Sequence, residues 1–300
     1  MSNIIVTGGA GFIGSNLVDK LVLLGHDVLV IDNLSTGNVT NINDKARFLE
    51  ADICDKIDLQ KAGLDTVDFV FHLAAQINLR KSLEDPIHDA ETNIMGSLNV
   101  IDLATIHKAK VIFASTGGAI YSPYEEIPWA EESLAIPESP YGISKLTTEH
   151  YLRVMSPNSA ILRLANVYGP RQNPHGEAGV IAIFLDRMLK GEPITVFGTG
   201  FQTRDFVYID DVVNAFVVAM KKKCRGIFNV STNKRTSVNM IVQYLNRMTS
   251  TKDLVVIGAP AIPGELEHSA LSHGKIKRDL GWHPLTSLEN GLKKTIAYYL

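Results

Sequence analysis

Three glycines spaced three residues apart constrain this chain more than any other feature of its sequence. They are Gly8, Gly11 and Gly14, and they follow the short apolar run 4–7. Apolar residues then recur at helical spacing over 12–24. A glycine turn between a strand and a helix lets the backbone approach a pyrophosphate, which the free N–H groups of the helix N-terminus attract. The segment therefore predicts a dinucleotide-binding βα unit.

An acidic residue stands where such a unit needs one. Asp32 ends the second predicted strand, eighteen residues after Gly14. A carboxylate at that place can accept hydrogen bonds from an adenosine ribose, and it would repel a 2′-phosphate. The two signals together favour NAD over NADP. The simpler interpretation, an ordinary glycine turn and an unrelated aspartate, does not account for their spacing.

Strand and helix patterns alternate through the first half of the chain. Short β-branched runs occur at 28–31, 69–73, 111–114 and 161–164, with helical patterns at 93–104 and 144–155. This alternation predicts an α/β fold, a doubly wound parallel sheet with helices on both faces.

The residue pattern changes near Gly169, where prolines and glycines break the chain into loops. Shorter elements are expected at 180–189, 194–197, 206–209 and 210–220, and a loop-rich tail at 260–284. We predict a Rossmann domain over 1–168. We expect a smaller lobe, mainly substrate-binding, over 169–300, with segments that return to the first domain.

Tyr141 and Lys145 lie four residues apart in a predicted helix, and therefore on one face of it. A free tyrosine is a poor base at neutral pH, because its pKa is about 10. A nearby ammonium, together with a positive nicotinamide, would favour the phenolate. The tyrosine could then take a proton from an alcohol while hydride leaves the same carbon. The same spacing also occurs on plain helix surfaces, so it gains weight only beside the glycine turn.

Hydroxyl groups end an earlier predicted strand, at Ser115 and Thr116. The carboxyl ends of parallel strands are where ligands bind in such sheets. One of these hydroxyls could hold a substrate oxygen beside Tyr141. We favour Thr116 and leave Ser115 open.

With these motifs in hand, the chain resembles the extended short-chain dehydrogenase/reductase family, and its UDP-glucose (UDP-galactose) 4-epimerase branch most. The resemblance covers nearly the whole chain. It rests on the segments 7–14, 32–37, 52–53, 72–75, 115–116, 141–145, 163–171, 202–211, 263–265 and 280–282, and on Asn93.

The resemblance implies a role for each matching residue. The implied NAD contacts are Gly8, Gly11, Phe12, Ile13, Gly14, Asp32, Asn33, Ser35, Thr36, Gly37, Asp52, Ile53, Leu73, Ala74, Ala75, Gln76, Asn93, Ser115, Tyr141, Lys145 and Val167. The implied contacts to a UDP-sugar are Thr116, Asn166, Gly179, Val180, Thr195, Phe197, Arg204, Glu265 and Ser269. Thr116, Tyr141 and Lys145 would be the catalytic residues.

The resemblance also implies an activity, the NAD-dependent epimerisation at C4 of a UDP-hexose through a transient 4-keto sugar. UDP-glucose and UDP-galactose are the expected substrates. NAD would then be a retained cofactor. The alternatives are a UDP-uronate 4-epimerase, another nucleotide-sugar oxidoreductase of the family, and a non-enzymatic nucleotide-binding protein.

Four positions depart from or refine the family pattern. Ile262 stands where the family often has an arginine on the UDP diphosphate, and Arg171 or Lys81 could supply the missing cation. Gly117 and Gly118 stand where related dehydratases carry acids, which argues against dehydration. The gate beside the sugar C2 group corresponds to the small Ser269, so we expect 2-acetamido sugars to fit.

Charge and composition exclude other classes of function. Lys plus Arg is 29 and Asp plus Glu is 32, a net charge of −3 without a basic surplus for nucleic acid. No apolar run is long enough to span a membrane, and two cysteines make no disulfide or metal pattern. We expect a cytoplasmic protein without a metal. The family resemblance implies a homodimer formed through the helices near 89–104 and from Tyr141.

Overall fold

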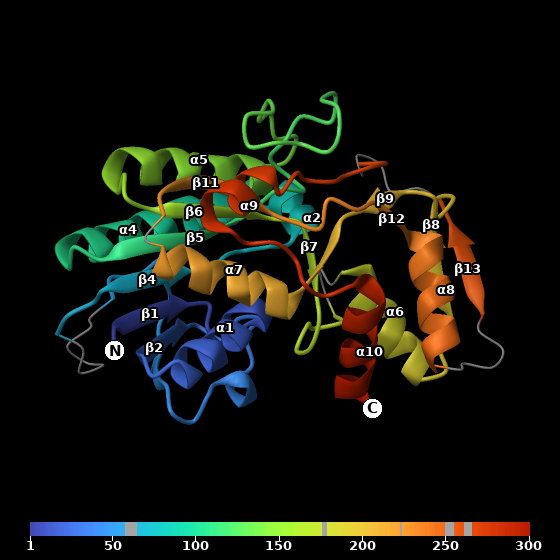
Figure 1. Ribbon diagram of the computed structural model, residues 1–300, viewed down its shortest axis with the longest axis horizontal. Coiled ribbons are helices and arrows are strands. Elements are labelled where there is room, and N and C mark those ends of the chain that lie inside the picture. The colour runs from blue at the N-terminus through green and yellow to red at the C-terminus, as the bar shows by residue number, and fades with distance from the viewer. Residues whose placement is uncertain (58–64, 176–178, 223, 250–254, 261–265) are drawn as a thin grey trace.

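Seven parallel strands form the central sheet of the computed structural model, which describes residues 1–57, 65–175, 179–222, 224–249, 255–260 and 266–300 (Figure 1). Their order is β11-β6-β5-β4-β1-β2-β3. They span Asn3–Thr7 (β1), Asp27–Asp32 (β2), Arg47–Glu50 (β3), Phe69–His72 (β4), Lys110–Thr116 (β5), Ala160–Leu164 (β6) and Gly226–Val230 (β11). The strand order reverses between β1 and β4. Ligands of open α/β sheets bind beyond the carboxyl ends of the strands at such a point.

Helices cover both faces of this sheet (Figure 1). α1 (Phe12–Leu23) and α7 (Ile209–Lys221) pack on one face, and α4 (Ser97–Ile106) and α5 (Pro140–Met155) on the other. Leu17 and Leu21 of α1 are fully buried, because helical spacing brings them to the sheet-facing side. The predicted doubly wound parallel sheet is confirmed.

A winding defect interrupts the helical run before α4. α2 (Leu79–Glu84) and α3 (Pro86–Ala90) lead into a π-helical segment, η3 (Glu91–Gly96), which continues into α4. The predicted helix 93–104 thus begins inside the π segment. Such π turns often mark functional sites.

The smaller lobe contains three helices and short strand pairs, on the right in Figure 1. The helices are α6 (Val180–Leu189), α8 (Val238–Thr249) and α10 (Leu288–Tyr299). β8 (Ile194–Phe197) pairs with β13 (Val256–Ala259), and β9 (Thr203–Arg204) with β12 (Thr236–Ser237). β7 (Asn166–Tyr168) pairs with β10 (Phe206–Tyr208) between the sheet and the lobe.

Late segments of the chain also contribute to the Rossmann layer. β11 is an edge strand of the main sheet, and α9 (Gly274–Leu280) packs against it. α9 falls inside the tail for which the sequence predicted loops, so that part of the expectation was wrong. The division of the chain at residue 168 stays a prediction, because these contacts cross it.

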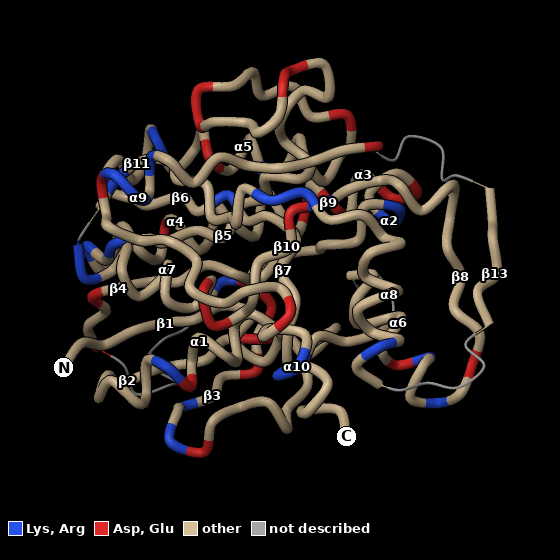
Figure 2. Tube along the Cα trace, turned by 45° about the vertical axis from the view of Figure 1, so that its right-hand side comes forward, with Lys and Arg blue, Asp and Glu red and all other residues tan. Residues whose placement is uncertain are grey.

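The long loop between β5 and α5 stands out from the rest of the surface in Figure 2, where it projects above α5 and carries a series of acidic residues. These are Glu125, Glu126, Glu131, Glu132 and Glu138. Within the described ranges no helix has the length and apolar character needed to cross a membrane.

Candidate active site

The glycine turn after β1 is as tight as the sequence predicted. Gly8 has a φ of +71°, and a Cβ there would lie 2.6 Å from the backbone nitrogen of Ala74. A Cβ on Gly14 would lie 2.1 Å from the carbonyl oxygen of Gly8. α1 begins after Gly11 with no side chain capping its first turn. The turn therefore presents backbone N–H groups that suit a pyrophosphate.

The predicted adenosine side is organised around two carboxylates. Asp32 Oδ2 accepts a hydrogen bond from the Ala10 nitrogen at 2.9 Å, and Oδ1 accepts one from the Leu34 nitrogen at 2.9 Å. Asn33 Nδ2 donates to Asp52 Oδ2 at 2.7 Å. These bonds fix the loop after β2 beside the glycine turn. Gly37 belongs to the same cluster, because a Cβ on it would lie 2.9 Å from Asp32 Oδ1.

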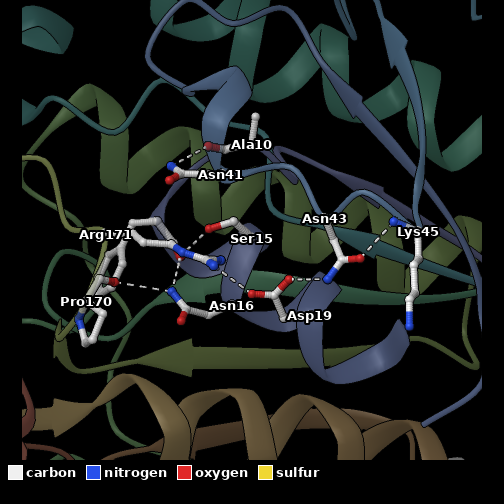
Figure 3. Close-up of polar contacts among 10 residues, drawn as sticks. Ala10, Ser15, Asn16, Asp19, Asn41, Asn43, Lys45, Pro170 and Arg171 are labelled. Carbon is white, nitrogen blue, oxygen red and sulfur yellow. Dashed lines mark hydrogen bonds and ion pairs between the residues drawn. The ribbon is translucent and has the colours of Figure 1, made fainter. Parts of the chain in front are cut away.

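Polar contacts also tie α1 to the loop after β7 (Figure 3). Arg171 Nη2 lies 2.8 Å from Asp19 Oδ2, and Asn16 Nδ2 donates to the Pro170 carbonyl oxygen at 3.3 Å. Asn43 Nδ2 donates to Asp19 Oδ1 at 2.6 Å. Arg171 is thus committed to Asp19. Ile262, the position whose missing arginine Arg171 or Lys81 was expected to replace, lies outside the described residues.

A chain of buried hydrogen bonds fixes the start of the loop after β4. The hydroxyl of Ser97 donates to the carbonyl oxygen of Asn93 at 2.6 Å, so it accepts from His72 Nε2, 2.9 Å away. His72 Nδ1 then accepts from Thr7 Oγ1 at 2.8 Å. Thr7 Oγ1 in turn accepts from the backbone nitrogens of Leu73 and Ala74. This chain of hydrogen bonds holds Leu73 and Ala74, two of the residues expected to contact NAD.

Burial keeps His72 neutral. The ring is fully buried, and burial together with the charge of Lys145 lowers the pKa of His72 to about 3. A neutral ring that donates from Nε2 and accepts at Nδ1 is a fixed structural link. It is therefore no candidate for acid–base chemistry near neutral pH.

Tyr141 and Lys145 occupy the first turns of α5, and Thr116 ends β5. The side chain of Thr116 lies close enough to the phenol of Tyr141 to lower its pKa. Lys145 Nζ donates to the Ala114 carbonyl oxygen at 3.1 Å and lies 4.7 Å from the centre of the Phe113 ring. The structure thus brings the three predicted catalytic side chains to the carboxyl end of β5.

The protein alone does not lower the pKa of Tyr141. Burial raises the pKa of Tyr141 to about 12, and the negative charge of Asp89 also raises this pKa. The side chain of Thr116 lowers it in part. Burial also lowers the pKa of Lys145 to about 8. The spacing of Tyr141 and Lys145 predicted a stabilised phenolate, but the lysine is directed at the Ala114 carbonyl.

The two hydroxyls at the end of β5 have different partners. Ser115 Oγ donates to Glu149 Oε1 at 2.6 Å, whereas Thr116 faces Tyr141. Glu149 also pairs with Arg163, whose Nη2 lies 2.6 Å from Oε2. Ser115, Glu149 and Arg163 are all buried. Ser115 is therefore part of a buried ion-pair network behind the site.

Leu271 fills the space beside Gly117. A Cβ on Gly117 would lie 2.2 Å from Leu271 Cδ1, whereas a Cβ on Gly118 would meet nothing within 4 Å. Leu271 is held in a small buried cluster with Tyr121 and Trp129. The segment that carries Leu271 thus connects the smaller lobe to the end of β5.

The predicted UDP contacts gather around β8 and β9 in the smaller lobe. Arg204 Nη1 donates to the Glu267 carbonyl oxygen at 3.4 Å, and the Ser269 nitrogen donates to the Thr203 carbonyl oxygen at 3.1 Å. Gln202 Nε2 donates to the carbonyl oxygen of Phe197 at 2.8 Å. Asn166, Thr195 and Phe197 lie on β7 and β8, Gly179 and Val180 at the start of α6. Glu265 lies outside the described residues.

Several buried residues that organise the site were not identified from the sequence. Asp89 accepts hydrogen bonds from Gln76, Asn93 and Ser144. Asp205 accepts from Thr232, Asn233 and Leu271. The available signal was that Asp89 and Asp205 stand just before predicted elements, where a buried acid would need such partners.

The residues fit an NAD molecule on two observations. The glycine turn is so tight that a Cβ at Gly8 or Gly14 would overlap backbone atoms of the protein, and α1 starts without a side-chain cap. Asp32 is placed at the end of β2, where a ribose would lie. The turn, Asp32 and the loop after β4 surround the point where the strand order reverses.

Comparison with known proteins places this geometry in context. Residues 4–231 match the model of the NAD dependent epimerase/dehydratase family. A UDP-glucose 4-epimerase of Mycolicibacterium smegmatis is 38% identical over 98% of this chain and 97% of its own.

Two solved structures are similar over the whole chain. A UDP-glucose 4-epimerase of Thermotoga maritima, solved with UDP-glucose, has a TM-score of 0.94 and 45% identity over 99% of this chain and 98% of its own. A UDP-glucose 4-epimerase of Thermus thermophilus, solved with NAD, has a TM-score of 0.92 and 39% identity over the same shares.

Proposed function

Because the chain belongs to the NAD-dependent epimerase/dehydratase family, we propose that it inverts the configuration at C4 of a UDP-hexose, with UDP-glucose and UDP-galactose as substrates. The observation that carries the proposal is the placement of Thr116, Tyr141 and Lys145 at the carboxyl end of β5. Relatives named UDP-glucose 4-epimerases match the chain from end to end, which supports the choice of substrate.

In the proposed mechanism Tyr141 takes the proton of the sugar 4-OH and later returns it. Thr116, whose side chain lowers the pKa of Tyr141, would hold the substrate oxygen beside the phenol. Bound NAD would supply the hydride acceptor for C4 and the donor that returns the hydride to the opposite face of the sugar. The positive nicotinamide also favours the phenolate, against the burial that raises the pKa of Tyr141 to about 12.

Lys145 contributes a positive charge in the same region. Its ammonium is held between the Ala114 carbonyl oxygen and the Phe113 ring. Asp89 and Glu149 raise the pKa of Lys145 against the burial that lowers it to about 8. The lysine is therefore mostly protonated at neutral pH and can donate to a ribose hydroxyl.

Leu271 supports epimerisation over dehydration. A dehydratase needs an acid beside the threonine to protonate a leaving hydroxyl. Gly117 cannot carry one, since Leu271 Cδ1 would lie 2.2 Å from its Cβ. Gly118 carries no side chain and supplies no acid either. We therefore propose that the reaction returns to a hexose without loss of water.

Ser269 is the residue that we propose to admit 2-acetamido sugars. Its backbone nitrogen is bonded to the Thr203 carbonyl oxygen at 3.1 Å, which fixes it at the edge of β9. A hydroxymethyl side chain leaves more room than a large gate residue would. UDP-N-acetylglucosamine should therefore turn over as well as UDP-glucose, and failure to do so would refute this part.

The test is proton NMR of UDP-galactose incubated with the protein and NAD, following the anomeric signal. We expect conversion to UDP-glucose without net NADH, and its loss in Tyr141→Phe. No conversion by a protein that still binds NAD would refute the substrate and make UDP-uronates the next to assay. Net formation of NADH would favour a dehydrogenase instead.

We also propose a homodimer, because α4 and α5 expose large apolar residues. Ile143, Tyr151 and Val154 share one side of α5, with Val154 76% exposed. Sedimentation should give twice the chain mass, and Val154→Glu should give a monomer. The matched control is Leu23→Glu on α1, 77% exposed on the opposite face of the sheet. A monomeric wild-type protein would refute the dimer.

A further inference from the structure

Asp89 of α3 is a fully buried acid whose hydrogen bonds come from three directions. Its Oδ1 accepts from Gln76 Nε2 and from Asn93 Nδ2, each at 2.9 Å, and its Oδ2 accepts from Ser144 Oγ at 2.6 Å. The two amide nitrogens can only donate. Three donors around one carboxyl group suit the ionised form.

These partners belong to the two parts of the chain that border the proposed reaction. Gln76 lies in the loop after β4, and Ser144 lies in α5 between Tyr141 and Lys145. Asn93 strengthens the first link, because its side chain exchanges two bonds with the backbone of Gln76, at 2.9 and 2.8 Å. Asp89 thus joins the loop to the catalytic helix.

The charge of Asp89 acts on the same two catalytic side chains. It raises the pKa of Lys145, as does Glu149, and it raises the pKa of Tyr141. The other charged or titratable neighbours are accounted for: Glu149 is paired with Arg163, and His72 is neutral. Among the described residues Asp89 has no ion-pair partner of its own, and its charge acts on Lys145.

We propose that Asp89 is a positioning residue of the reaction: it joins the loop at Gln76 to the catalytic helix at Ser144, and it supplies a fixed negative charge that keeps Lys145 protonated. The proposal rests on the proposed function for its catalytic meaning. The geometry of the link does not depend on which sugar is used.

Asp89→Asn separates the two contributions. An asparagine can still accept from Gln76 and Asn93 and can donate to Ser144, so it preserves the link and removes the charge. Ser144→Ala does the reverse. The control is Glu84→Gln, which removes a charge from an exposed position on the neighbouring α2.

The direct measurement is NMR of the NAD-loaded protein with lysine labelled at 13Cε, the Lys145 signal being identified by its loss in Lys145→Arg. The Lys145 signal should titrate at lower pH in Asp89→Asn than in the wild type. Its titration midpoint should be unchanged in Glu84→Gln and Ser144→Ala. An unchanged midpoint in Asp89→Asn would overturn the proposal. This titration needs no sugar, so it stands even if the substrate is wrong.

The kinetic measurement completes the test. In Asp89→Asn the alkaline limb of the kcat profile should move to lower pH, because Lys145 loses its proton earlier. Ser144→Ala should lower kcat by roughly tenfold or more with the limb unmoved, since small displacements of catalytic groups are costly. A uniform loss of kcat in Asp89→Asn, with no movement of the limb, would reduce Asp89 to a purely structural residue.

Discussion

Leu271 occupies the space into which any side chain at position 117 would have to project. A Cβ on Gly117 would lie 2.2 Å from Leu271 Cδ1 and 2.8 Å from Leu271 Cδ2. Leu271 cannot easily move, because it is 2% exposed and packed with Trp129 and Tyr121. The smaller lobe thereby dictates what the end of β5 can carry.

Gly117→Ala should therefore destabilise the protein by about 1–3 kcal/mol, as overpacking does in a well-filled core. Leu271→Ala alone should cost about 2–5 kcal/mol through the cavity it leaves. In the double variant the new methyl group enters that cavity, so the two losses should not add. Urea unfolding of the four proteins measures the coupling, and strict additivity would contradict the contact.

The two hydroxyls at the end of β5 should respond differently to removal. Thr116→Val should lower kcat by about 10²-fold or more, because the oxygen beside Tyr141 is lost. Ser115→Ala should mainly lower stability, by about 1–3 kcal/mol, because Glu149 loses a donor while buried. Steady-state kinetics and unfolding of both variants check this. A larger kcat loss in Ser115→Ala would reverse the assignment.

His72 should remain neutral, in the tautomer protonated at Nε2, down to about pH 5. Its pKa in the folded protein is about 3, against 6.5 when free of the fold. The unfolded state binds the extra proton between these values. The free energy of unfolding therefore decreases as the pH is lowered through that window, by up to about 1.4 kcal/mol per pH unit. The 15N chemical shifts of the ring report the tautomer. Titration of His72 near pH 6.5 would contradict its role as a buried, neutral link in the chain of hydrogen bonds.

Arg171 allows a comparison of strain with charge. Its φ is +70°, which disfavours any residue with a Cβ, while its guanidinium pairs with Asp19 at 2.8 Å. Arg171→Ala and Arg171→Gly lose the same ion pair, but only glycine relieves the backbone. The glycine variant should be more stable than the alanine variant by about 0.5–1 kcal/mol in thermal unfolding. Equal stabilities would show that the strain is absorbed elsewhere.

The local part of this architecture was predictable from the sequence. The glycine turn, Asp32 and the Tyr141–Lys145 pair each lie within one βα unit or one helix, where spacing alone fixes geometry. The elements 180–189 and 194–197 were predicted at the bounds they have. Local periodicity is enough for such segments because their packing follows from one buried face.

The contacts between distant segments were not predictable in the same way. Ser115 and Thr116 are adjacent hydroxyl residues that the sequence alone does not distinguish. They differ because Glu149, 34 residues after Ser115, accepts a hydrogen bond from Ser115. Leu271 reaches Gly117 across the interface of the lobes, and Asp89 reaches Ser144 across 55 residues. α9 was missed because seven residues give too few turns for a helical period to be recognised.

The π-helical segment η3 has a consequence for the polar residues that line its inner side. Asp89, Asn93 and Ser97 follow one another at intervals of four, and all three are buried. In a regular α-helix each such step overshoots a full turn by about 40°, so three residues at this interval spiral away from any single line. The wider turn of η3 reduces this overshoot, and hydrogen bonds link the three residues in a row, from Ser97 Oγ to the Asn93 carbonyl oxygen and from Asn93 Nδ2 to Asp89 Oδ1. Deleting a single residue from η3 would restore regular winding, yet it would rotate one half of this row out of phase with the other.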